Sequence, residues 1–187
     1  MRKKILFLAG MMACCSLAGA QEISKTWVAD KGNGTYQNPV LHADYSDPDV
    51  CAAGDDFYMT ASSFNCIPGI PILHSNDLVN WSLVNCALPI QEPEEFFDKA
   101  QHGKGVWAPA IRFHNGEFYI YWGDPDYGIY MIKAKDPKGR WSKPVLVKAG
   151  KGMIDPTPLW DEDGKVYLVH AYAGSRSGVN SIVVICE

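Results

Sequence analysis

The chain has 187 residues, enough for one ordinary domain and too few for two large ones, and 47% of them are hydrophobic. Its 17 basic and 21 acidic residues give a net charge of −4, and no Lys/Arg cluster follows the first few residues. Binding to a phosphate backbone needs a basic face, so we expect no nucleic-acid partner.

The first twenty residues have the composition of a secretory signal. A basic start at 2–4 precedes an apolar stretch at 5–17 and a small-residue cleavage site that ends at Ala20. The apolar stretch is shorter than the ~20 residues that span a bilayer, so we expect no membrane span. A lipoprotein signal is the alternative, but Met11-Met12-Ala13 fits such a site poorly. The sequence therefore predicts a signal peptide at 1–20 and export to the periplasm or the medium.

Beyond a lead-in at 21–36, three segments resemble one another. Each is a tight polar turn followed by an aromatic or branched strand, the pattern of a β-hairpin: Gly54–Met59, Asn115–Ile120 and Asp163–Leu168. Each hairpin follows a short strand that begins with a distinctive residue, 11 or 12 residues before the hairpin tyrosine: Asp47, Trp107 and Asp155. The tyrosines are 61 and 48 residues apart, which leaves room for about four short strands per repeat.

These repeats predict an all-β fold of successive blades, a β-propeller. No amphipathic helix of several turns is evident after the signal, and prolines fall at the expected strand edges and turns. The first strand of each propeller blade lies beside the central channel, so residues at the same end of these strands converge. We therefore expect Asp47, Trp107 and Asp155 to form one pit with two carboxylates and an indole.

Seven short motifs occur in order at blade spacing. They are Asn38–Leu41, Asp44–Asp49, Ser62–Phe64, Pro68–Ile72, His74–Trp81, Gly105–Pro109 and Ile154–Leu159. In these motifs the chain resembles glycoside hydrolase family 43, from about Gln37 to the last residue. The resemblance implies a five-bladed β-propeller, of which residues 37–187 cover about the first three blades. It also implies hydrolysis of plant polysaccharide or oligosaccharide as a β-xylosidase, α-L-arabinofuranosidase or arabinanase.

The resemblance further implies an inverting mechanism and the roles of five residues. Asp47 matches the general base, and Asp155 matches the carboxylate that orients the general acid and tunes its pKa. Inversion needs one ionised carboxylate beside a water and one protonated group beside the leaving oxygen. Phe64, Trp107 and Ala108 match residues that line the sugar pocket of the family.

The general acid of the family is a Glu in a Glu-Gly-Pro context in a later blade, and this tripeptide does not occur here. Glu187 is the only acidic residue after Asp163, and it ends an apolar strand-like run, so we do not assign it. We expect the chain to be an incomplete catalyst whose acid lies beyond residue 187. Loss of general-acid catalysis typically lowers a rate by ~10²–10⁴.

Several neighbouring residues have alternative interpretations. Asp44 and Asp49 are rivals of Asp47 for the role of base, and only the resemblance separates them. Trp81 and Trp141 occupy equivalent places in two repeats and are expected in the blade core.

No cofactor is expected, and we assign no metal ligand. Residues 161–164 resemble a calcium loop without its later Glu, and a hairpin turn accounts for them better. Some relatives hold calcium near the propeller axis, so calcium stays possible but unassigned. Four cysteines outside the signal match neither a metal site nor a dense disulfide scaffold, and we expect buried or half-buried thiols with any pairing left open: Cys51, Cys66, Cys86 and Cys186.

Three classes of function remain from the sequence. The first is an exo-acting glycosidase, with the 64–71 loop closing one end of the pocket, although an arabinanase with an open groove is an alternative. The second is a non-catalytic carbohydrate-binding propeller. The third, a purely structural repeat protein, leaves the two carboxylates beside Trp107 unexplained. The choice between xylose and arabinose, and the oligomeric state, are not indicated.

Overall fold

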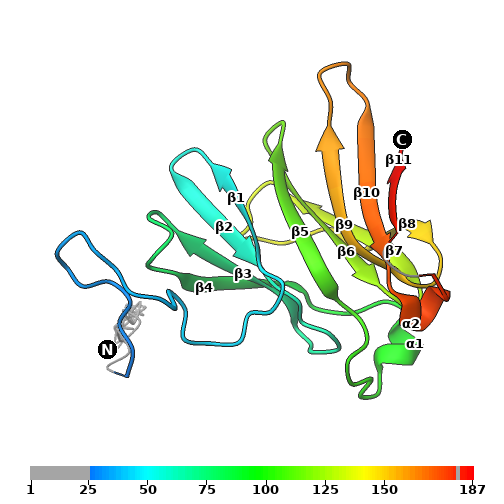
Figure 1. Cartoon of the computed structure of the whole chain (residues 1–187), viewed down its shortest axis with the longest axis horizontal. Helices are drawn as coiled ribbons and strands as arrows, with labels where there is room; N and C mark the ends of the chain where they lie inside the picture. Colours follow the sequence, from blue (N-terminus) through cyan, green and yellow to red (C-terminus); the bar gives the residue numbers. More distant parts are fainter. Residues whose placement is uncertain (1–25, 180–181) are drawn as a thin grey trace, which may run out of the picture.

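The computed structural model describes residues 26–179 and 182–187, so the predicted signal peptide lies outside the described residues. The strands form three antiparallel sheets that lie side by side, and the middle sheet contacts both others (Figure 1). The all-β prediction is confirmed. Within the described residues, no helix is long and apolar enough to cross a membrane.

Each sheet is built from strands in chain order. The first comprises β1 (Asp49–Ala53), β2 (Asp56–Thr60), β3 (Gly69–Ser75) and β4 (Ser82–Leu88). The second comprises β5 (Trp107–His114), β6 (Glu117–Asp124), β7 (Gly128–Ala134) and β8 (Val145–Ala149). The third comprises β9 (Met153–Trp160), β10 (Val166–Tyr172) and β11 (Val183–Cys186). One-turn helices follow β4 and β10: α1 (Glu94–Phe97) and α2 (Gly174–Ser177).

The predicted hairpins join the first two strands of each sheet. The β5–β6 turn shows why its sequence suits it, because Asn115 and Gly116 have φ of 49° and 78°, as a two-residue hairpin turn requires. Residues 161–164 form the β9–β10 turn, where Asp161 and Lys165 share a backbone hydrogen bond of 2.9 Å. The hairpin interpretation of this segment is confirmed.

The apolar core lies mainly between the first and second sheets. Its fully buried side chains include Ile70, Leu88, Val106, Ile111 and Trp122. The predicted core position of Trp141 is confirmed at 7% exposure. Trp81 departs from the prediction, since it is half-buried and lines a hollow of about 600 Å³ beside the lead-in.

The third sheet packs on the second through contacts of β9 with β5, β6 and β7. Trp160 of β9 stacks on His114 of β5, with ring centroids 4.6 Å apart. Met153 of β9 is buried, whereas Val183 and Ile185 of β11 are each 68% exposed.

The four cysteines of the described residues are free thiols. Cys51, Cys86 and Cys186 are half-buried, as predicted, but Cys66 is exposed because it lies in the loop between β2 and β3. Burial raises the pKa of the Cys51 thiol to about 12.

A single guanidinium joins the first strands of all three sheets. Arg112 of β5 donates hydrogen bonds to Asp49 Oδ2 of β1 and, over 2.7 Å, to Thr157 Oγ1 of β9. The backbone N–H of Ile111 donates to the same Asp49 oxygen over 2.7 Å. These contacts fix the positions of β1, β5 and β9 relative to one another along the strand direction.

Asp124, the last residue of β6, is a buried carboxyl at 1% exposure. Its Oδ1 accepts a hydrogen bond from the backbone of Asp126 over 2.9 Å, whereas its Oδ2 has no partner among the described residues. Burial raises the pKa of Asp124 to about 6, and the negative charge of Asp126 adds to the effect.

The first prediction concerns Arg112. Replacing Arg112 by Met removes its hydrogen bonds to Asp49 and Thr157 and leaves the Asp49 carboxylate without its cationic partner, which should lower the free energy of unfolding by about 2 kcal/mol. Arg112→Lys should lose about half as much, because an ammonium cannot bridge two strands as a planar guanidinium does. Urea unfolding of the purified variants measures both values.

The control for Arg112 is Lys133→Ala, which breaks the more exposed ion pair between Lys133 and Glu117 on β7 and β6. Such surface pairs contribute about 0–1 kcal/mol. Equal losses for Arg112→Met and Lys133→Ala would show that the three-strand contact has no special importance.

The second prediction concerns Asp124. Since the folded state binds this proton more tightly than the unfolded state, its titration should lower stability as the pH rises from about 4 to about 6. Asp124→Asn removes the titration, so its stability relative to wild type should increase over that window by on the order of 2–3 kcal/mol. Thermal or urea unfolding at pH 4, 5, 6 and 7 measures this difference. Asp163→Asn, in an exposed turn, is the control, and parallel profiles for Asp124→Asn and wild type would contradict the prediction.

Candidate active site

Three non-glycine residues with positive φ stand at the same end of the first strands. Asp47, Ala108 and Asp155 have φ of 50°, 35° and 52°, and each directly precedes a proline. A residue before proline favours extended backbone, so this left-handed conformation is doubly unfavourable. Such strain costs on the order of 1–3 kcal/mol per residue and concentrates at functional sites.

Bulges accompany two of these residues. Between Ile154 and Thr157, three steps along β9 oppose two steps along β10, and Asp155 lies in the excess. The same mismatch separates Trp107 from Ala110 on β5, where Ala108 lies in the excess. A bulge redirects a side chain away from the sheet alternation, which is how a strand can present a residue at its rim.

This geometry corrects the predicted equivalence of the three repeats. In the second sheet, the counterpart of Asp47 and Asp155 is Ala108, because Ala108 shares their φ and the following proline. Trp107 lies one residue earlier. The expected pit therefore has two carboxylates and a methyl group at equivalent positions, with the indole beside them.

Asp47 and Asp155 lie near enough to interact electrically. Partial desolvation raises the pKa of Asp155 above its ordinary value, and the negative charge of Asp47 raises it further. As whole residues both are exposed, so the carboxyl groups are accessible to solvent and to a ligand. The arrangement suits a site where one carboxylate accepts a proton and a second influences a nearby acid.

Ser62 is a part of the site that the sequence did not single out as functional. Its hydroxyl donates to Asp47 Oδ2 over 2.7 Å and accepts from the backbone N–H of Ala108 over 2.8 Å. The only sequence signal was its place in the Ser62–Phe64 motif. Its partners lie 15 and 46 residues away, so neither contact is visible in the sequence.

The two predicted pocket aromatics come from adjoining segments. Phe64 exchanges backbone hydrogen bonds of 3.0 and 2.9 Å with Val106, which directly precedes Trp107. The Trp107 indole N–H donates to the carbonyl of Gly103 over 3.0 Å, which fixes the ring. Between them, Gly105 has φ of 93°, and a Cβ there would lie 2.4 Å from the Phe64 carbonyl, so only glycine fits.

Asp49, the nearest rival for the role of base, is engaged elsewhere. Its Oδ2 accepts hydrogen bonds from Arg112 and from the Ile111 backbone. This carboxylate therefore has a structural contact that Asp47 lacks. Asp44 lies before β1 and is exposed.

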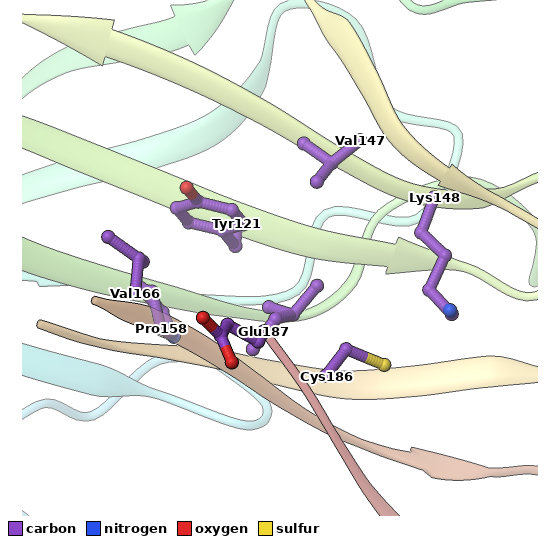
Figure 2. Close-up of a pocket in the computed structure, with 8 residues that line it drawn as sticks. Tyr121, Val147, Lys148, Pro158, Val166, Cys186 and Glu187 are labelled. Atoms are coloured by element: carbon purple, nitrogen blue, oxygen red, sulfur yellow. The ribbon is translucent and has the colours of Figure 1, made fainter.

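A cavity of about 240 Å³ lies between the second and third sheets, apart from these residues (Figure 2). Its lining includes Tyr121 and Val147 from one sheet and Pro158 and Cys186 from the other. Glu187 also lies here and pairs with Lys165 over 2.9 Å, so it does not join Asp47 and Asp155. No group of three potential metal ligands occurs in the part of the chain that the structure describes.

Comparison with known proteins identifies relatives over most of the chain. Residues 36–186 match the model for glycosyl hydrolases family 43. A beta-xylosidase of Formosa agariphila is 36% identical over 173 residues, which cover 88% of this chain and 29% of the relative. The non-reducing end alpha-L-arabinofuranosidase BoGH43B of Bacteroides ovatus is 38% identical over 139 residues, which cover 72% of this chain and 26% of the relative. The chain thus spans less than a third of the length of these relatives.

Solved structures agree with this assignment. A xylan beta-1,4-xylosidase from Bacillus halodurans superposes with a TM-score of 0.66 at 28% identity, over 80% of this chain and 30% of that one. The GH43B protein of the Bacteroides ovatus xyloglucan locus gives a TM-score of 0.60 at 34% identity, over 71% of this chain and 27% of that one. With the matched family model and the repeated antiparallel sheets, these similarities show that the chain belongs to glycosyl hydrolases family 43.

Proposed function

We propose that this chain is part of an exported, inverting glycoside hydrolase that releases terminal xylose or arabinose from plant cell-wall polysaccharide. The observation that carries the proposal is the pair Asp47 and Asp155, two accessible carboxylates on strained backbone at one end of the first strands. The names of the relatives, beta-xylosidase and alpha-L-arabinofuranosidase, support the substrate class.

In the proposed mechanism, Asp47 is the general base. It takes a proton from the water that attacks the anomeric carbon on the face opposite the leaving group. The new carbon–oxygen bond forms as the glycosidic bond breaks, so the configuration inverts. The hydrogen bond from Ser62 holds one oxygen of this carboxylate in place.

Asp155 acts as the modulating carboxylate. It lies close enough to Asp47 to have its pKa raised, in a partly desolvated position. A negative group there would raise the pKa of an adjacent general acid and keep it protonated until the leaving oxygen needs its proton. We propose that a Glu from polypeptide beyond residue 187 supplies this acid and that further blades complete a five-bladed propeller.

Phe64, Trp107 and Ala108 form the proposed wall of the sugar subsite. A pentose ring has an apolar face that an aromatic side chain can cover, while polar groups bind its hydroxyls. The backbone contact between Phe64 and Val106 keeps the two aromatics beside the carboxylates. We propose that the loop between β2 and β3 closes one side of this subsite, which favours exo action.

The third prediction tests the mechanism in the gene product extended to its stop codon. It should release 4-nitrophenol from the β-D-xylopyranoside or the α-L-arabinofuranoside. Asp47→Ala should lower kcat by about 10²–10⁴, because the attacking water loses its proposed base. Asp155→Asn should lower it less and shift the basic side of the pH profile toward lower pH, because the acid loses its negative neighbour. NMR of the first sugar released should show the inverted anomer.

The control for these variants is Asp163→Asn, in the exposed β9–β10 turn. Wild-type activity retained by Asp47→Ala would overturn the proposed mechanism. Binding of xylo- or arabino-oligosaccharides without hydrolysis by the extended protein would favour a non-catalytic carbohydrate-binding propeller instead.

A further inference from the structure

We infer that Ser62 is the positioning residue of the general base: it holds one oxygen of Asp47 and leaves the other directed to the attacking water. The inference rests on the proposed function, since it assumes that Asp47 is the base. It gives Ser62 a part in the reaction distinct from those of Asp47 and Asp155.

The hydrogen-bond capacity of the hydroxyl determines its orientation. A serine hydroxyl has one donor hydrogen and two acceptor lone pairs. The N–H of Ala108 can only donate, so over 2.8 Å it occupies a lone pair of Ser62 Oγ. The single hydrogen is then directed to Asp47 Oδ2, 2.7 Å away, which can only accept when ionised.

The backbone of Ser62 strengthens this arrangement. Its N–H donates to the carbonyl of Ser46 over 3.0 Å, so Ser62 bonds to the residue before Asp47 as well as to the Asp47 side chain. Asp47 has an unfavourable φ of 50° before a proline and needs such contacts to keep its position. Ser62 therefore joins three segments: the approach to β1, the loop after β2 and the bulge of β5.

Ser62 influences the reaction by positioning the Asp47 carboxylate. Ser62 engages Oδ2 alone, so its hydrogen bond does not compete with a water at Oδ1. It moves no proton itself. Its donor is already used by Asp47 and one lone pair by Ala108, so it has little capacity left to bind a sugar hydroxyl. Loss of the hydroxyl should therefore affect the chemical step more than substrate binding.

Steady-state kinetics of the extended protein tests this inference. Ser62→Ala should lower kcat about 10- to 100-fold, the usual scale for a misplaced catalytic group, with KM changed less than about twofold. Ser62→Thr keeps the hydroxyl and should restore most of kcat. Ser62→Cys keeps nearly the same volume with a weak donor and should resemble Ser62→Ala, which separates the hydrogen bond from packing.

The matched control is Ser142→Ala. The Ser142 hydroxyl also accepts a backbone N–H, from Lys133 over 3.0 Å, and donates onward to the Lys143 carbonyl, but it lies on the outer part of the second sheet. Ser142→Ala should lose about as much stability as Ser62→Ala, but its kcat should not fall. Thermal unfolding of each variant shows whether a loss of activity reflects a loss of fold.

The outcomes separate this inference from the proposed function. Inactive Asp47→Ala together with fully active Ser62→Ala would overturn the positioning role alone. A raised KM with unchanged kcat in Ser62→Ala would also overturn it, since Ser62 would then bind substrate. Activity that survives in both Asp47→Ala and Asp155→Asn would overturn the proposed function, whatever Ser62 does.

Discussion

The contact of the Arg112 guanidinium with two neighbouring strands is the constraint on which the site depends. Its partners, Asp49 and Thr157, each lie two residues after one of the strained carboxylates, Asp47 and Asp155. The contact that fixes the positions of Asp49 and Thr157 along their strands therefore also fixes those of Asp47 and Asp155. A planar group with several donors can hold two strands at once, which an apolar contact between sheets cannot do with the same directional precision.

Surrounding contacts hold the strained backbone at the start of the first strands. Positive φ before proline is unfavourable in isolation, and it persists only where surrounding contacts over-determine the backbone. Asp47 is held by Ser62, and Ala108 is held by the same hydroxyl. The first and second sheets also share the buried apolar core, which includes Ile70, Val106 and Ile111. The site is therefore most firmly built where these two sheets meet.

Sequence alone was sufficient for the sheets, because hairpin turns and aromatic strands have local signatures that recur at each repeat. It was not sufficient for register. The counterpart of Asp155 in β5 is Ala108, not Trp107, and each of the two lies in a bulge that sequence patterns do not predict. The proline that follows each of them was the sequence signal for this equivalence. Nor could the sequence assign Asp49 or Ser62, whose partners are 63 and 46 residues distant and meet only after the sheets pack.

The two carboxylates of the site differ through their surroundings rather than their chemistry. Asp47 accepts a hydrogen bond from Ser62, which holds one of its oxygens in place. Asp155 is partly desolvated and lies in the field of Asp47, and both effects raise its pKa. Neighbouring acids whose environments differ can take different roles in a reaction. These different surroundings agree with the proposed roles, in which Asp47, held by Ser62, is the base and Asp155 is the modulator.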